Sequence, residues 1–310
     1  MKCVEVERAE DAKHFRTLIA HTEPKRPVIY SMTKEEKKRF VAHDKWDREF
    51  FAKRSGEAHY RNTRNPTFFN IPSDSVWDIA HFFVLRTCSW AEFVDKIQNK
   101  KEHVLISGID AHLRTMGNSV VDKWKDCWID IQPGLDEFVP GGTKSDDIDI
   151  VGLWLSGSGI SCQTHWDIIG DHNLLFQIKG KKRFLLWEPM DGQEHLYPVP
   201  FRFWHTSRIP DPYNVDLQQF PLYRHAKTFA TEMKEGDILY VPARWWHHVT
   251  HDGDFNMNIA CWYASQYRLR KPHPIKTWCV PRPISGFFLL LKVVVAVLLA
   301  MFLMFKQKLL

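Results

Sequence analysis

The sequence predicts a mainly β protein, a sandwich or barrel preceded by helices, and three observations support this fold class. From about residue 103 the chain consists of short apolar β-like runs separated by Gly, Pro and Asp clusters, at the spacing of sandwich and barrel strands. Before that point, the apolar residues follow helical patterns. The 310 residues include 13 Trp and 21 Phe, which is ample material for a core and excludes a disordered chain.

The N-terminal part is expected to combine one short strand with two helices. Residues 27–30, Pro-Val-Ile-Tyr, follow a turn-prone stretch and predict the strand. Thr33 and Glu36 have the spacing of a capping box, which predicts a helix from there to about Lys53. Its apolar side would be formed by Phe40, Trp46 and Phe50. A second helix is expected over 89–99, where a Ser cap opens the segment.

Six β-like runs follow and justify the barrel or sandwich. They are HVLISGI (103–109), IDIVGLWLSG (148–157), NLLFQIKG (173–180), KRFLLWEP (182–189), DILYVP (237–242) and NMNIACWY (256–263). The third and fourth runs predict two strands joined by a turn at Lys179-Gly180-Lys181.

The C-terminal segment has a different character. Residues 286–305 are apolar except for Lys292, and this length predicts a single transmembrane helix. Residues 276–285 would be a Pro-rich linker before it. Since the N-terminus lacks the apolar region of a secretory signal, the segment predicts a tail anchor, with a membrane as partner. More Lys and Arg residues precede the segment than follow it, which favours a cytosolic main body, with the endoplasmic reticulum as one candidate membrane.

Charge and cysteines exclude several classes. The formal net charge of +5 permits contact with anionic lipid or nucleic acid but points to neither. The six cysteines are scattered without a C-x-x-C pair, so the sequence supports neither a zinc finger nor a dense disulfide framework.

One pair of polar residues indicates a metal site. In a strand, His165 and Asp167 would point to the same face, because residues i and i+2 share a face. A second imidazole is available in YVPARWWHHVTH (240–251), which follows a predicted strand. Two imidazoles and one carboxylate are the ligand set of non-haem iron(II) sites, which keep open positions for a cosubstrate and dioxygen. Spacing alone leaves open whether His247 or His248 is the ligand.

A cosubstrate such as 2-oxoglutarate would also need a cation. Lys182 stands on the strand after the predicted turn and shares a face with Phe184 and Leu186. On an interior face, an unpaired ammonium in an apolar barrel would be costly. The alternative is a solvated turn lysine.

From about Val151 to Tyr263, the sequence resembles the JmjC branch of the cupin-type 2-oxoglutarate oxygenases. The motifs that carry the resemblance are HWD, NLLFQIKGKKRFLLWEP, EHLYP and GDILYVPARWWHHV. They are most similar to small members: the asparaginyl hydroxylase of hypoxia-inducible factor, the wybutosine tRNA hydroxylase and a heat-shock-protein-associated JmjC protein. The resemblance implies a double-stranded β-helix, or jelly roll, over 108–275, with residues 1–107 as an N-terminal α+β extension packed on it.

The resemblance also implies roles for individual residues. Carried over, His165, Asp167 and His247 become the iron(II) ligands and the catalytic centre, with His248 as a neighbour only. Lys182 matches the lysine that binds the far carboxylate of 2-oxoglutarate, and Asn173 matches a polar residue near that cosubstrate.

Two further positions follow less directly from the resemblance. Asn258 matches a second asparagine on the cosubstrate side, with Asn256 as a rival. The family commonly places a hydroxyl residue just before the first ligand, to share the carboxylate with Lys182. Cys162 occupies the nearest position here, so Ser161 or Thr164 is left for that role.

By this resemblance, the protein is expected to be a dioxygenase that uses Fe(II), 2-oxoglutarate and O2 and releases succinate and carbon dioxide. A protein side chain is the first choice of substrate, and hydroxylation the first choice of reaction. Lysine demethylation comes second, and hydroxylation of tRNA third, because no RNA-binding motif is visible. An inactive, membrane-tethered binding scaffold is the alternative of another class. The sequence predicts no oligomeric state.

Overall fold

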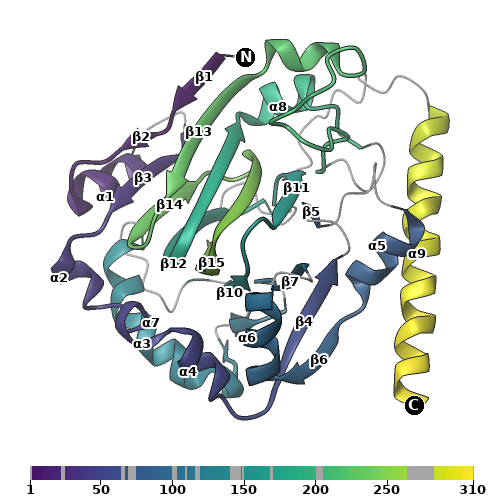
Figure 1. The fold of residues 1–310 in the computed structure, drawn as a ribbon. Helices are drawn as coiled ribbons and strands as arrows, with labels where there is room; N and C mark the ends of the chain where they lie inside the picture. The colour runs from purple at the N-terminus through teal and green to yellow at the C-terminus, as the bar shows by residue number, and fades with distance from the viewer. Residues whose placement is uncertain are drawn as a thin grey trace.

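Two long strands, β12 (His172–Trp187) and β15 (Trp246–Tyr263), pair antiparallel along their lengths at the centre of the fold (Figure 1). The structure is a computed structural model. It describes residues 2–21, 25–63, 67–68, 75–99, 103–108, 110–115, 119–139, 148, 150–167, 170–199, 205–263 and 283–309.

Hydrogen bonds link the strands into one 15-stranded sheet, and the two long strands run through both of its halves, which are called the two sheets below. The first half of β12 pairs with β14 (Asp237–Val241), and its second half pairs with β13 (Lys227–Met233). The first residues of β15 pair with β11 (Ser161–His165), and its last residues pair with β10 (Ile150–Ser156). The strand pair therefore joins the two sheets, and the mainly β part of the fold prediction is confirmed.

The other strands extend these sheets. They are β1 (Lys2–Glu5), β2 (Glu7–Arg8), β3 (Val28–Ser31), β4 (Glu57–Thr63), β5 (Thr67–Phe68), β6 (Arg86–Ser89), β7 (His103–Ile106), β8 (His112–Thr115) and β9 (Ser119–Val120). Strand β3 pairs with β14, and β7 pairs with both β4 and β10. Strands from the first 107 residues thus continue the sheets of the later ones, and the strand predicted at 27–30 is confirmed within one residue.

The predicted turn at Lys179-Gly180-Lys181 is a bulge inside one continuous strand. The register between β12 and β15 shifts here, and Gly180 adopts a φ of +73°. Leu175 and Phe184 are an odd number of residues apart, yet both line one pocket, where strict alternation would place them on opposite faces. The prediction of two separate strands was therefore wrong, because the bulge changes the facing of the strand without ending it.

Replacing Gly180 with alanine is expected to lower the free energy of unfolding by roughly 1–3 kcal/mol. An added Cβ would lie 3.0 Å from the carbonyl oxygens of Asp252 and Phe255, and the left-handed φ is itself unfavourable. Gly159→Ala is the matched control, since Gly159 has a φ of +80° but no atom within 4 Å of the added Cβ. Urea unfolding would measure both, and an equal loss would show that crowding by β15 contributes nothing.

The helices lie around the sheets. They are α1 (Ala12–His21), α2 (Lys34–Lys37), α3 (Ala42–Lys45), α4 (Arg48–Ala52), α5 (Val76–Phe83), α6 (Trp90–Asn99), α7 (Lys125–Phe138), α8 (Pro189–His195) and α9 (Pro283–Leu309), with short 3-10 helices η1 (Asp122–Trp124) and η4 (Pro221–His225). Helix α6 begins after Ser89, whose hydroxyl caps the Glu92 amide, so the helix predicted over 89–99 is confirmed.

The single helix predicted from Thr33 to Lys53 was wrong. The capping box between Thr33 and Glu36 is present, but the segment forms the three short helices α2, α3 and α4. Phe40 and Trp46 are both fully buried, and six residues of α-helix would turn their side chains well away from each other. Breaks in the helix let both side chains reach the core.

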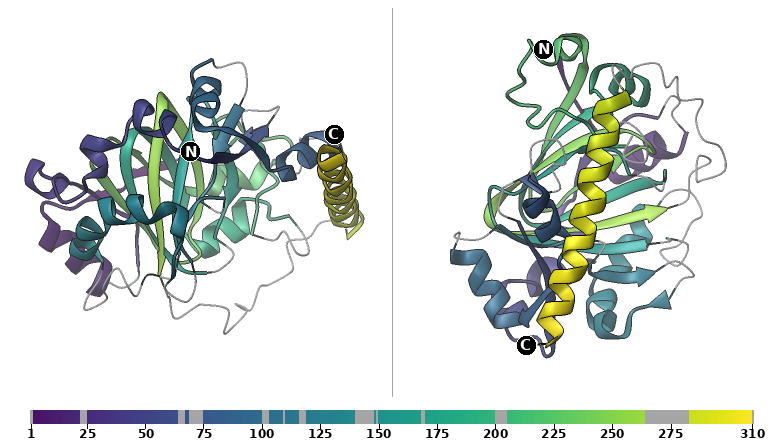
Figure 2. Two further views of the ribbon diagram at one scale, coloured as in Figure 1. Left: turned by 90° about the horizontal axis from the view of Figure 1, so that it is seen from below. Right: turned by 90° about the vertical axis from the view of Figure 1, so that its right-hand side faces the viewer.

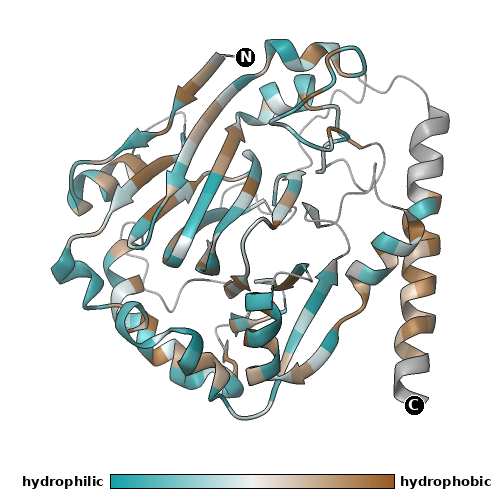
Figure 3. Cartoon of the chain, viewed as in Figure 1, coloured by the Kyte–Doolittle hydropathy of each residue, from teal (hydrophilic) through white to brown (hydrophobic). Residues whose placement is uncertain are grey.

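The C-terminal helix α9 lies beside α5, outside the two sheets (Figure 2). Ala296 and Ala300 of α9 are buried in one cluster with Ile79 and Ala80 of α5. Figure 3 shows how strongly apolar the described middle part of α9 is.

Within the part of the chain that the structure describes, no helix is both long and apolar enough to cross a membrane. The predicted transmembrane helix over 286–305 was therefore wrong, and so were the tail-anchored location and the membrane partner that depended on it. The physical reason is that small residues such as Ala296 let α9 pack closely on α5. The chain itself thus covers one face of α9, while Leu298, Phe302 and Phe305 on the same helix stay exposed. The predicted linker at 276–285 lies outside the described residues as far as residue 282.

Candidate metal centre and cosubstrate pocket

Three polar side chains converge between the two sheets. His165 ends β11 and is the register partner of His247 in β15, and Asp167 follows two residues after His165. Asp167 Oδ1 lies 3.7 Å from His165 Nε2 and 3.9 Å from His247 Nε2. One ligand atom from each residue lies within 4.8 Å of the other two. Among the described residues, these three side chains are the only such group.

Neighbouring groups orient all three side chains. His165 Nδ1 lies 2.7 Å from the Gln163 carbonyl oxygen, and His247 Nδ1 lies 3.0 Å from the Trp245 carbonyl oxygen. Because these carbonyls hold a proton on Nδ1, the Nε2 atoms are left as the free donor atoms on the site.

The carboxylate is oriented in the same way. Asp167 Oδ2 accepts hydrogen bonds from Trp262 Nε1 at 2.9 Å and from Asn173 Nδ2 at 3.3 Å. Its other oxygen, Oδ1, faces the two imidazoles. One carboxylate oxygen is therefore fixed by the protein, and the other is available to a ligand.

The protonation states suit a cation. Burial, followed by the charge of the nearby His247, lowers the pKa of His165 to about 3, so its imidazole is neutral at neutral pH. Burial alone would raise the pKa of Asp167, but the two imidazoles and the hydrogen bonds from Trp262 and Asn173 outweigh it and hold the pKa below its usual value. A neutral imidazole at His165 and an ionised carboxylate at Asp167 are the forms in which these two groups bind a metal.

This donor set fits iron(II). Two imidazole nitrogens and one carboxylate oxygen on one side of a metal leave its other positions open, which is the arrangement of non-haem iron(II) centres. The carbonyl oxygens of Gln163 and Trp245 and the indole N–H of Trp262 are the outer partners that such ligands need.

Lys182 lies in the same pocket, which Leu175, Phe184 and Val249 help to line. Lys182 is 3% exposed, and its Nζ makes no hydrogen bond or ion pair with a described residue. Its one described partner is the face of the Trp154 ring, 5.4 Å away. Burial lowers its pKa to about 7. An ammonium buried without a counter-ion is costly, which indicates a site built for an anion.

The other basic residues next to Lys182 in the sequence do not line the pocket. The side chain of Lys181 is exposed, and Arg183 pairs with Asp252 at 3.2 Å on the outside. Lys179 is partly buried, and its Nζ donates hydrogen bonds to the His43 carbonyl oxygen and to Glu235.

The remaining predicted residues divide into two groups. Asn173 lines the pocket and contacts Asp167. Thr164, Asn258 and Asn256 are not among the pocket-lining residues. The Thr164 hydroxyl lies 3.3 Å from His248 Nδ1, and the Asn258 amide donates to the Phe176 carbonyl oxygen.

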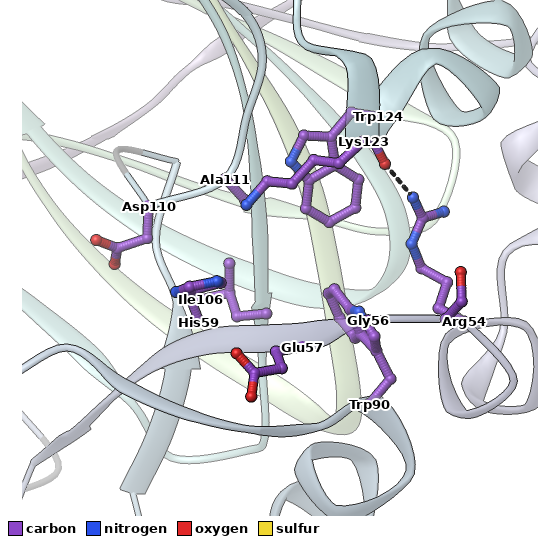
Figure 4. A pocket seen from close by; sticks show the side chains of 11 residues that line it. Arg54, Gly56, Glu57, His59, Trp90, Ile106, Asp110, Ala111, Lys123 and Trp124 are labelled. Atoms are coloured by element: carbon purple, nitrogen blue, oxygen red, sulfur yellow. Dashed lines mark hydrogen bonds between the residues drawn. The ribbon is translucent and has the colours of Figure 1, made fainter. Parts of the chain in front are cut away.

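A larger pocket lies between β4, α6 and η1, of about 760 Å³ against about 400 Å³ for the metal pocket (Figure 4). Two of its charged side chains, Arg54 and Asp110, already have partners. Arg54 donates to the Lys123 carbonyl oxygen and lies over the Trp124 ring, and Asp110 makes two hydrogen bonds with Arg61. The smaller pocket is the candidate site, because among the described residues it alone combines metal donors with a buried cation that has no anionic partner there.

The family of cupin-like domains matches residues 6–269, which is most of the chain. The chain belongs to the cupin-like family. Human HSPB1-associated protein 1 is 34% identical over 112 residues, which are 36% of this chain and 22% of that protein. Human tRNA wybutosine-synthesizing protein 5 is 30% identical over 188 residues, 58% of this chain and 56% of that protein. Jumonji C domain-containing protein 5 of Drosophila melanogaster is 34% identical over 111 residues, 36% of this chain and 26% of that protein.

These relatives confirm the predicted resemblance to cupin-like JmjC proteins. This cupin-like chain spans between about a fifth and just over half of their lengths.

Among the pocket residues that have a polar atom in the side chain, the sequence pattern did not identify three: Trp154, His251 and Trp262. Trp262 lies in a predicted strand, opposite Asn173 in the register. The pairing of Trp262 with Asn173 would have placed Trp262 in the pocket. A sequence pattern does not give this pairing, because the register of the two strands shifts near Gly180. His251 stands four residues after His247 and shares its face by simple alternation, so the sequence pattern did contain a signal for it.

Proposed function

We propose that this cupin-like protein is an Fe(II)- and 2-oxoglutarate-dependent dioxygenase. One observation carries the proposal: a group of two histidines and one aspartate shares a pocket with the buried ammonium of Lys182, which has no anionic partner among the described residues. The first feature suits iron(II), and the second suits the far carboxylate of 2-oxoglutarate.

The residues of the pocket have separable tasks. His165, Asp167 and His247 would hold the metal, and Trp262 would keep Asp167 in place through its hydrogen bond. When bound, iron(II) supplies the redox chemistry by which O2 converts 2-oxoglutarate to succinate and carbon dioxide and oxidises a C–H bond of the substrate. Lys182 would fix the cosubstrate by a charge-assisted hydrogen bond, and the apolar walls would exclude water.

Protein side-chain hydroxylation is the reaction that we propose first, because the motifs are most similar to small hydroxylases. Hydroxylation of tRNA is the second candidate. It is favoured by the relative named tRNA wybutosine-synthesizing protein 5, which aligns with 58% of this chain, more than the two other relatives described above.

The test is iron-dependent succinate formation by the purified protein. We expect succinate to form with Fe(II) and 2-oxoglutarate in the presence of a peptide library, and the product peptides to gain the mass of one oxygen atom. A parallel reaction with a tRNA pool tests the second candidate. Absence of succinate with every pool would contradict an oxygenase and favour a binding scaffold.

A further inference from the structure

The imidazole of His251 lies beside Lys182 in the metal pocket. It lies on β15 directly opposite Lys182 of β12, so the two side chains project side by side from one face of the sheet. Both line the pocket that contains the metal-binding group. His251 is 1% exposed, which places its imidazole in the interior.

The imidazole of His251 is held in one orientation. Its Nδ1 lies 2.6 Å from the hydroxyl oxygen of Ser156, a residue that is itself buried. Its backbone is held on both sides, because its N–H donates to the Ile160 carbonyl oxygen and its own carbonyl accepts from the Gly159 N–H. The Ser156 hydroxyl can donate to Nδ1, and the ring proton then lies on Nε2.

That Nε2 atom is buried without a hydrogen-bond partner among the described residues. A buried polar group in this state is destabilising until a ligand satisfies it. The Nζ atom of the neighbouring Lys182 likewise has no hydrogen-bond partner among the described residues. The Trp154 ring contacts both side chains, with its centroid 5.4 Å from Lys182 Nζ and 6.4 Å from the His251 ring centroid. Two donors without a hydrogen-bond partner among the described residues therefore lie together in the pocket.

The two hydroxyl residues expected from the sequence to share the cosubstrate carboxylate with Lys182 make other contacts. Ser161 Oγ lies 2.6 Å from Thr67 Oγ1, and Thr164 Oγ1 lies against His248. Cys162 does line the pocket, but burial raises the pKa of its thiol, and a neutral thiol is a weak donor. Among the described residues that line the pocket, His251 is the side chain left to assist Lys182.

We propose that His251, oriented by Ser156, donates a hydrogen bond from Nε2 to the same cosubstrate carboxylate that Lys182 binds. The inference rests on the proposed function. An ammonium and an imidazole N–H in neighbouring positions can each take one oxygen of a planar carboxylate. Burial and the charge of Lys182 lower the pKa of His251 well below its usual value. The pair therefore carries one positive charge, which matches a single carboxylate.

The test compares two ligands that differ only at this end. 2-Oxopentanoate has a methyl group where 2-oxoglutarate has its far carboxylate. Isothermal titration of the Mn(II)-loaded protein measures the binding of each without turnover. His251→Phe is expected to weaken 2-oxoglutarate binding by about tenfold and to leave 2-oxopentanoate binding unchanged. His251→Gln, which keeps an N–H donor, is expected to recover part of the loss.

The control is His43→Phe, the same change at a buried histidine outside the pocket, which is expected to alter neither affinity. Thermal unfolding of each variant checks that it is folded. Unchanged 2-oxoglutarate affinity in folded His251→Phe would overturn the inference and leave the proposed function standing. Equal weakening of both ligands would also overturn it, by showing a general packing role. If the wild-type protein bound no 2-oxoglutarate, both the inference and the proposed function would fall.

Discussion

Replacing Asp167 with alanine is expected to abolish metal binding and 2-oxoglutarate turnover while the protein stays folded. The change removes the only carboxylate of the metal-binding group. Loss of an outer partner of a metal ligand typically costs 10- to 100-fold in affinity, so loss of a ligand should cost at least about 100-fold. Metal analysis of the purified variant after incubation with Fe(II), together with a succinate assay, measures both effects.

Two further variants separate the metal from the fold. Asp167→Asn keeps an oxygen that can accept from Trp262 Nε1, so it should lose metal affinity with little loss of stability. Asp191→Asn is the matched control, because Asp191 also pairs with a histidine, His195, at 2.9 Å but lies outside the pocket. Metal content in Asp167→Ala equal to that of the wild type would refute the assignment of this site.

Replacing Lys182 with alanine is expected to weaken 2-oxoglutarate binding by roughly 10- to 100-fold. A hydrogen bond to a charged group contributes about 1.5–3 kcal/mol, and each 1.4 kcal/mol is a tenfold change in affinity. The matched control is Lys181→Ala, since Lys181 is the exposed neighbour in the same strand. Titration calorimetry measures the affinity of both variants, and equal affinities would argue against the predicted role of Lys182.

The same lysine predicts a pH dependence. Burial lowers the pKa of Lys182 to about 7, so its ammonium form is populated below that pH and lost above it. Only the ammonium form attracts the carboxylate. Wild-type affinity for 2-oxoglutarate should therefore fall as the pH rises through about 7, and Lys182→Ala should lack this dependence. A wild-type affinity that rises over the same range would contradict the assignment.

Much of the site could be predicted because its pattern is local. His165 and Asp167 are two residues apart on one strand end, and the paired tryptophans mark the position of His247. Lys182 was predictable as interior from its alternation with Phe184. These inferences need only the two-residue period of a strand and a family pattern, and neither depends on long-range register.

The rest depended on contacts between distant segments. Trp262 reaches Asp167 only because the register of β12 and β15 shifts at Gly180, which no short-range pattern shows. The helix predicted from Thr33 to Lys53 divides because the core requires both Phe40 and Trp46. The apolar C-terminal segment was assigned to lipid, because nothing in its own sequence shows that α5 packs against it.

The bulge at Gly180 constrains how the gene can change. Asn173 and Lys182 stand on either side of it and line one pocket only because the irregular stretch from Gln177 to Lys181 separates them. A deletion or insertion of a single codon between them would turn either the amide or the ammonium to the opposite face of the sheet. A one-codon insertion or deletion at residues 178–181 would therefore disable the pocket without changing any residue that lines it.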